Sequence, residues 1–218
     1  ITAGVGETAT GQGGTLQLSS DRLSVREGGA ITVGTSGRGN AGGLNINTNA
    51  AVEVIGTSPN GERSSVISAG TALSATGDGG DVTISTQQLQ VGDGGLILLD
   101  TFGEGDAGDL AIHARESVDV VGVSANGGAS VIAAGVGAVA TGEGGDVSIA
   151  TQDLTVRRGG VILVSTFGRG DAGELEIDAD AVNVVGTSAN GRLPSGIVAE
   201  VGRGRSGREG MWRSTLAI

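Results

Sequence analysis

The chain repeats itself, and this repeat constrains the fold more than any other feature of the sequence. Residues 77–84 (GDGGDVTI) return as residues 142–149 (GEGGDVSI), and a weaker copy begins at residue 11. A Ser-x-Asn-Gly motif also occurs three times, at residues 58–61, 124–127 and 188–191. A long internal repeat is typical of solenoids, in which each unit packs on the next. We therefore expect an array of stacked units.

Each long repeat contains two smaller units, which we call coils. A pair of aliphatic residues two positions apart opens each coil. The first members of these pairs are Leu16, Leu44, Val82, Leu110, Val147 and Leu175. Their spacings of 28, 38, 28, 37 and 28 residues alternate between short and long coils. We predict one domain over residues 1–202, with coils that start near residues 11, 43, 77, 108, 142 and 173.

Every coil holds three short runs in which two aliphatic residues flank one residue of another kind. In the coil that starts near residue 77, the runs are 82–84, 89–91 and 97–99. Such alternation has the period of a β-strand, and no helical period competes with it. Three short strands per coil, each stacked on its counterpart in the next coil, describe an all-β fold. The sequence therefore predicts a parallel β-helix of about six coils.

The runs also predict which side chains point inward. The first two runs of each coil give two columns that contain only Leu, Ile and Val. In the long coils the sequence is also compatible with a third column that is shifted by one residue. A shift of one residue exchanges the inward and outward faces of a strand. Our predicted third column is Ile31, Val33, Val66, Ser68, Ile97, Leu99, Val131, Ala133, Ile162, Val164, Ile197 and Ala199.

The long coils gain their extra residues at two places. One is the Asn-Gly turn after the second run, and the other is the Gly-rich return at residues 70–80 and 135–145. Asn-Gly pairs favour tight turns, because both residues tolerate left-handed backbone geometry. We expect protruding loops on an edge of the solenoid at every second coil. Loops are a common place for specific binding.

Composition narrows the possible functions. The chain has no Cys, so disulfides and zinc–thiolate chemistry are excluded. Its 13 basic residues are all Arg and face 24 acidic residues, for a net charge of -11. This balance argues against a nucleic-acid partner, which requires a basic surface. No apolar run approaches the ~18 residues of a membrane span, so we expect a segment that does not span a membrane.

The two ends of the sequence depart from the coil pattern. Residues 1–6 parallel residues 132–137, which predicts that the chain begins inside a coil and is a fragment of a longer polypeptide. Residues 203–218 replace the repeat with four Arg, Met211 and Trp212. With permitted codons, a frame shifted by one base reads residues 206–215 as a repeat block. We interpret this tail as out-of-frame sequence, with a genuine capping segment as the alternative.

Four acidic residues precede the first strand in successive coils: Asp81, Asp109, Asp146 and Glu174. Stacking would bring these carboxylates to about 5 Å from one another, where like charges repel. A hard cation such as calcium would relieve this repulsion. The alternative is that each acid fixes its own turn and faces water. The Gly-Asp pattern differs from the calcium-binding nonapeptide, because that motif repeats in immediate tandem.

Catalytic motifs are weak in this sequence. His113 is the only histidine, and no serine nucleophile motif accompanies it, so a catalytic triad has no support. β-Helix enzymes that act on acidic polysaccharides generally need aromatic platforms, and this chain has two Phe and one Trp. Phe102 and Phe167 occupy matching turns, and we interpret them as packing partners two coils apart. We therefore predict no catalytic residues and no organic cofactor.

The order of motifs resembles one known group of proteins. Gly-Asp-Val-x-Ile is followed by x-Leu-x-Val-x-x-Gly-Gly-x-Ile, and then by Thr-Phe-Gly-x-Gly-Asp-Ala-Gly at residues 101–108 and 166–173. This idiom, over residues 1–202, resembles the filamentous-haemagglutinin-like exoproteins of cyanobacteria. The amino-terminal secretion domain of such proteins, with its Asn-Pro motifs, is not in this stretch.

The resemblance implies a right-handed β-helix shaft of a secreted or surface-displayed adhesin. It also implies export by two-partner secretion through an outer-membrane transporter, and location at the surface of a Gram-negative-type bacterium. Its partners would be surface glycans or other cells. The alternative function is that of a carbohydrate-active β-helix enzyme, a polysaccharide lyase or hydrolase.

Overall fold

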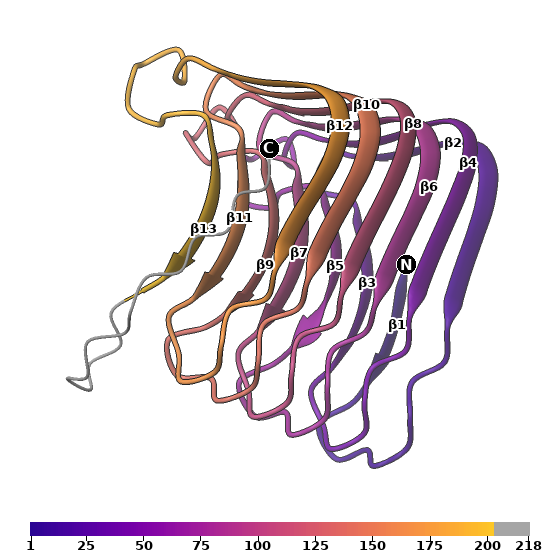
Figure 1. The fold of residues 1–218 in the computed structure, drawn as a ribbon. Helices are drawn as coiled ribbons and strands as arrows, with labels where there is room; N and C mark the ends of the chain where they lie inside the picture. The colour runs from indigo at the N-terminus through magenta and orange to yellow at the C-terminus, as the bar shows by residue number, and fades with distance from the viewer. Residues whose placement is uncertain (203–218) are drawn as a thin grey trace.

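The computed structural model describes residues 1–202, which form β-strands and no helix. The prediction for residues 203–218 lies outside the described residues. The strands build two parallel sheets (Figure 1). The seven-stranded sheet has the order β1-β3-β5-β7-β9-β11-β13, and the six-stranded sheet has the order β12-β10-β8-β6-β4-β2. The strands are β1 (Thr2–Val5), β2 (Leu16–Arg26), β3 (Ala30–Thr35), β4 (Leu44–Ile55), β5 (Val66–Thr71), β6 (Val82–Gly92), β7 (Leu96–Thr101), β8 (Leu110–Val121), β9 (Val131–Val136), β10 (Val147–Arg157), β11 (Val161–Thr166), β12 (Leu175–Val185) and β13 (Gly196–Val201).

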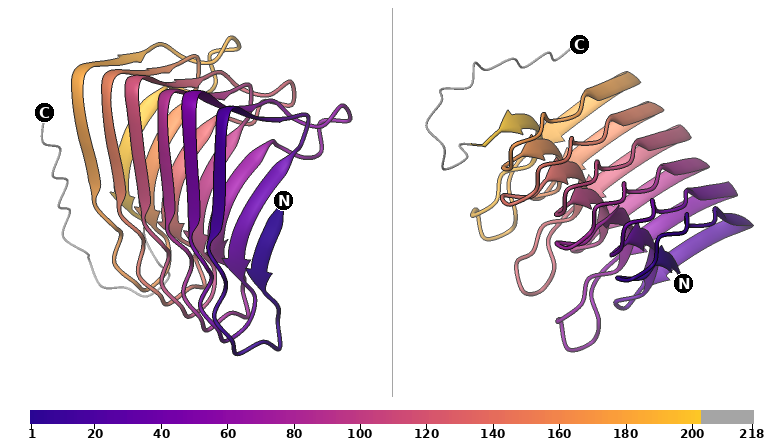
Figure 2. Two further views of the ribbon diagram at one scale, coloured as in Figure 1. Left: turned by 90° about the vertical axis from the view of Figure 1, so that its right-hand side faces the viewer. Right: turned by 90° about the horizontal axis from the view of Figure 1, so that it is seen from below.

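Consecutive strands alternate between the two sheets, so each coil adds one strand to each sheet. Equivalent residues stack directly: Val82 pairs with Leu110, and Leu110 pairs with Val147. The chain therefore rises by one strand spacing, about 4.8 Å, with every coil. The coils line up along one axis (Figure 2). This arrangement is the parallel β-helix that the repeat predicted.

The structure differs from the prediction in the number of strands. The first and second runs of each coil belong to one strand of 11 or 12 residues, so each coil has two strands instead of three. The register shifts inside this strand, for example between Ser20 and Arg22 and between Thr86 and Gln88. Such a shift lets a strand bend while its pairing continues on both sides. The expected corner is therefore a bend within a strand.

Aliphatic side chains fill the space between the sheets. The first two predicted columns are buried through the middle of the solenoid, where Val82, Leu89 and Val118 are fully inaccessible to solvent. The same columns are open at the last coil, where Val182 is 47% exposed. The core is continuous from coil to coil. The coils thus share one interior, which is the source of stability in a solenoid.

The third column is shifted by one residue in two long coils. Ile67 and Ala69 on β5, and Ile132 and Ala134 on β9, are fully buried, whereas the predicted residues Val66, Ser68 and Val131 are only half-buried. Ser68 instead lies on the outer face and donates a hydrogen bond to Thr32 Oγ1 at 3.3 Å. The cause is pairing: Ile67 aligns with Ile31 and Ile97. The local sequence alternates too weakly to distinguish the faces, because Val and Ile are adjacent.

The short and long coils differ at their corners. In the short coils, a tight turn joins the sheets, as at Asp93 and Gly94, which have φ of 51° and 87°. Gly95 N donates to Gly92 O at 2.8 Å across this turn, which has the positive φ values of a type I′ turn. In the long coils, residues 56–65, 122–130 and 186–195 instead form the Asn-Gly loops, each closed by an antiparallel bridge. These loops protrude from the same edge (Figure 2, right).

The shifted register leads to a test by substitution. Ile67→Ala should lower the free energy of unfolding by about 2–5 kcal/mol, because it empties a buried site in a continuous core. Val66→Ala removes a half-buried side chain from the outer face and should cost about 1 kcal/mol or less. Urea denaturation of the two variants measures both values. Equal losses, or a larger loss for Val66→Ala, would contradict the observed register.

Candidate functional site

The predicted acidic column is a hydrogen-bonded ladder along the Gly-rich corner. Asp81 Oδ1 accepts a bond from Asp109 N at 3.0 Å, Asp109 Oδ1 accepts from Asp146 N at 2.9 Å, and Asp146 Oδ1 accepts from Glu174 N at 2.7 Å. All four side chains are exposed to solvent. Each aspartate of the ladder therefore fixes the backbone of the next coil, which differs from both sequence interpretations, since neither expected a bond between coils.

A second ladder, which sequence reasoning missed, runs beside the first. Its side chains stand three residues earlier in each coil. Asp78 Oδ1 accepts from Asp106 N at 3.1 Å, and Asp106 Oδ1 accepts from Glu143 N at 2.7 Å. Asn40 continues this column toward the N-terminus and donates its side-chain amide to Asp78 Oδ2 at 2.8 Å. The signal was visible in the sequence as acids that recur three residues apart.

The ladders bear on the calcium hypothesis. Asp81, Asp109 and Asp146 each direct Oδ1 toward a backbone N–H of the next coil. Within residues 1–202, no group of three or more His, Cys, Asp or Glu side chains is close enough to hold a metal ion. The ladder positions Asp81, Asp109, Asp146 and Glu174 for bonds between coils. Calcium binding by these residues stays a prediction.

A column of glycines shapes the outer face of the seven-stranded sheet. Gly4 pairs with Gly34, and Gly34 pairs with Gly70. An ideal Cβ at Gly34 would stand 2.7 Å from Gly70 O, so the close approach of the strands requires glycine there. On β7 the column is interrupted by Asp100, and on β9 it resumes at Gly135, which pairs with Asp100. The missing side chains leave a hollow beside β7.

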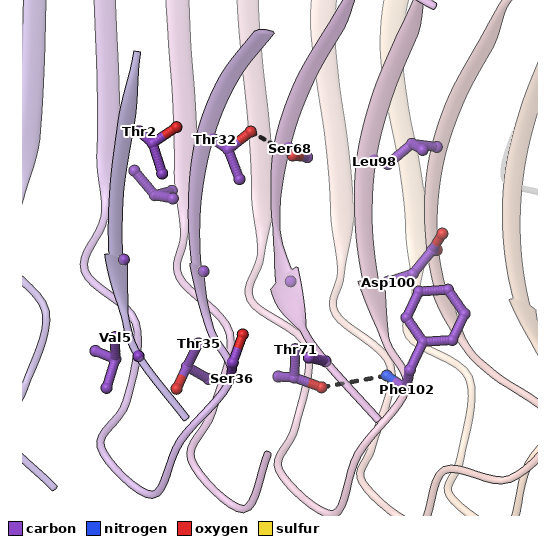
Figure 3. Close-up of a pocket in the computed structure, with 16 residues that line it drawn as sticks. Thr2, Val5, Thr32, Thr35, Ser36, Ser68, Thr71, Leu98, Asp100 and Phe102 are labelled. Atoms are coloured by element: carbon purple, nitrogen blue, oxygen red, sulfur yellow. Dashed lines mark hydrogen bonds between the residues drawn. The ribbon is translucent and has the colours of Figure 1, made fainter. Parts of the chain in front are cut away.

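The hollow is a groove of about 540 Å³ across β1, β3, β5 and β7 (Figure 3). Leu98 and Asp100 on β7, with Phe102 directly after this strand, form its wall. The hydroxyl-bearing residues Thr2 and Thr32 lie in one row with Ser68 and Leu98 across the strands (Figure 3). The volume falls in the range of small-molecule sites. This groove is the candidate binding site of the described chain.

Asp100 is the one charged residue among those that line the groove. Burial raises the pKa of its carboxyl from the ordinary value of 3.8 to about 6, because desolvation disfavours the charged form. Among residues 1–202, no side chain or backbone group forms a hydrogen bond or an ion pair with this carboxylate. Perturbed carboxyls of this kind are concentrated at functional sites.

The phenylalanines stand at the end of the groove wall and at the matching turn. Phe102 lies against Gly137 of the next coil, since an ideal Cβ at Gly137 would be 2.6 Å from Phe102 Cδ1. Phe167 lies in the same way against Gly202. Each ring therefore contacts a glycine one coil away, and Phe102 remains 45% exposed. The Phe102 ring lies beside Asp100 and contributes to the lining of the groove (Figure 3).

His113 lies on the outer face of the six-stranded sheet and is exposed, as expected. It pairs across the strands with Ser85 on one side and Ala150 on the other. Sequence reasoning did not foresee Ser85 as a neighbour. Within the described chain, no hydrogen bond joins the two side chains, and Ser85 belongs to no nucleophile motif. The pair therefore lacks the hydrogen bond through which a base activates a nucleophile.

Comparison of the chain with known protein families, characterised proteins and solved structures gives no match. The structure shows a parallel β-helix with two acidic ladders and a groove whose floor is glycine backbone. Over residues 1–202, no helix is long and apolar enough to cross a membrane.

The ladder interpretation is tested at Asp109. Asp109→Ala removes the acceptor of Asp146 N and should lower the free energy of unfolding by about 0.5–1 kcal/mol. Asp109→Asn keeps an oxygen acceptor and removes one charge from the column, so its melting temperature should equal or exceed that of the wild type. Differential scanning calorimetry, with calcium and with chelator, measures both effects. Equal destabilisation by the two substitutions would contradict the hydrogen-bond role, and a melting temperature indifferent to calcium would contradict the calcium prediction.

Asp100 should make stability depend on pH. Between about pH 4 and pH 6, the folded chain keeps a proton on this carboxyl that the unfolded chain has released, so stability falls as the pH rises. Asp100→Asn removes this loss and should be more stable than the wild type at pH 7 by roughly 1–3 kcal/mol. Urea denaturation of both proteins at pH 4 and at pH 7 measures the difference. A difference that is the same at both pH values would contradict the burial of the carboxyl.

Proposed function

We propose that this chain is a non-catalytic shaft segment of a large adhesin, secreted or displayed at the surface of a Gram-negative-type bacterium. The observation that carries the proposal is the in-register stacking of alternating short and long coils around one continuous aliphatic core. Each coil extends the rod by about 4.8 Å. A rod of this kind holds whatever is attached at its two ends apart. It also repeats its own surface features at fixed intervals.

The Asn-Gly loops are the repeated feature best placed to make contacts. They leave the rod at every second coil, so neighbouring loops are about 10 Å apart along the axis. Asn126 of the second loop donates its side-chain amide to Gly61 O of the first loop at 2.9 Å, which ties the two loops together. Repeated weak contacts from one rigid body gain avidity through multivalency. We propose surface glycans or other cells as the partners.

The export route belongs to the same proposal. The motif order that resembles filamentous-haemagglutinin-like exoproteins of cyanobacteria supports two-partner secretion through an outer-membrane transporter. The acidic ladders, with a net charge of -11 over the chain, disfavour contact with nucleic acid.

The alternative function is a carbohydrate-active enzyme, either a polysaccharide lyase or a hydrolase. One observation favours it: the groove combines a half-buried carboxyl, Asp100, with an exposed ring, Phe102. A glycosidase needs a pair of carboxyl groups flanking the bond that breaks. Asp100 is the single acid of this groove, so the binding role is the better-supported one.

A loop-deletion series tests the adhesin proposal. Each Asn-Gly loop is replaced by the four-residue turn of a short coil, Arg26–Gly29, and binding to a glycan array and to whole cells is measured. Removal of one loop should weaken avidity by roughly tenfold, and removal of all three should abolish it. A matched control shortens the return at residues 138–139, away from the loops and from the lining of the groove, and should bind like the wild type.

Two results would overturn the proposal. One is unchanged binding after removal of all three loops, with circular dichroism showing an intact β-fold. The other is turnover of a polysaccharide by the unmodified chain in a lyase or hydrolase assay run on the same preparation. The second result would establish the enzyme alternative directly.

A further inference from the structure

The groove beside β7 has an unusual distribution of charge. Its floor is backbone, because Gly4, Gly34 and Gly70 carry no side chains. Its single charged group is Asp100, and no Arg lines it. A ligand that enters this groove therefore meets one carboxylate in otherwise neutral surroundings.

No group of the described chain neutralises this carboxylate from the neighbouring strands. Gly70 lies on the β5 side, Gly135 pairs with Asp100 on β9, and Ser165 follows on β11. The next acid in the column is Glu200 on β13, and no basic residue stands in the column. The ion pairs of residues 1–202 lie on the opposite sheet, where Glu53 meets Arg22 and Arg26. A half-buried carboxylate without a partner favours a ligand that brings a positive charge.

The rest of the groove restricts the ligand further. Thr2 and Thr32 present hydroxyls on the side opposite β7, and Ser68 Oγ is bonded to Thr32 Oγ1 at 3.3 Å. The Phe102 ring is 45% exposed beside Asp100. Hydroxyls bind the hydroxyls of a ligand, and an aromatic face attracts both apolar C–H groups and cations. The groove thus matches a small ligand that carries hydroxyls and an ammonium on one ring.

We propose that this groove binds a sugar with a free amine, such as a glucosamine unit, with its ammonium against the Asp100 carboxylate. The sugar hydroxyls face Ser68 and Thr32, and the apolar face of the sugar ring lies toward Phe102. An anionic sugar would meet Asp100 with repulsion, and a neutral sugar would leave the carboxylate desolvated without a counter-charge. This site goes beyond the adhesin proposal, because it lies on the sheet face away from the Asn-Gly loops.

The experiment is an NMR titration of the isotopically labelled chain at pH 7 with glucosamine, glucose and N-acetylglucosamine. Glucosamine should give saturable shifts confined to the amides of β3, β5, β7 and the turn after Thr71. Glucose and N-acetylglucosamine lack the ammonium and should bind roughly tenfold more weakly. Asp100→Asn keeps the shape of the side chain and should weaken glucosamine binding to the same extent.

A matched control is Asp119→Asn, which removes an aspartate from the outer face of β8 on the opposite sheet and should leave glucosamine binding unchanged. The amide spectra of both variants report whether the fold is intact. The proposal is wrong if the wild type shows no saturable shifts, if N-acetylglucosamine binds as tightly as glucosamine, or if Asp100→Asn binds like the wild type. Because the Asn-Gly loops do not enter this measurement, its failure would leave the loop-based adhesin proposal standing.

Discussion

The stacking of aliphatic side chains from one coil onto the next is the interaction on which the structure depends. A single coil buries about six such side chains, at roughly 1.5–3 kcal/mol each, while ordering its backbone costs roughly 1–2 kcal/mol per residue. One coil is therefore unstable alone. Stacking joins the small apolar sets into one core and pairs the backbone N–H and C=O groups of neighbouring coils. The residues at the coil corners take their positions from this core.

Because equivalent residues stack, a residue type that recurs at one position of every coil forms a column along the rod. Asp before the first strand becomes a ladder in which Asp109 Oδ1 receives the N–H of Asp146, so hydrogen bonds offset the repulsion between stacked carboxylates. Glycine near the end of the seven-stranded sheet becomes a floor that lets backbones approach closely. Asp100 breaks this column once, and the break creates the wall of the groove. The groove is thus a local exception within a regular array.

The sequence predicted the features that depend on the repeat, and missed those that depend on neighbouring strands. The parallel β-helix and the alignment of Val82 with Leu110 followed from spacing alone. The register of β5 did not, because Val66 and Ile67 are both aliphatic and only the pairing with Ile31 decides between them. The prediction that the first two runs form separate strands was also wrong. A bend within one strand and a break between two strands leave the same pattern of side chains in the sequence. The groove was not predicted, because residues 4, 34, 70 and 100 become neighbours only when the strands pair.

The most direct test of the account measures contacts between methyl groups in the core. With selectively labelled Leu and Val, nuclear Overhauser effects should connect Val82 to Leu110 and Leu110 to Val147, because these residues belong to adjacent coils about 4.8 Å apart. Val82 and Val147, two coils apart, should show a much weaker effect. Absence of the adjacent contacts, or strong Overhauser effects between these methyls and water, would contradict a stacked aliphatic core.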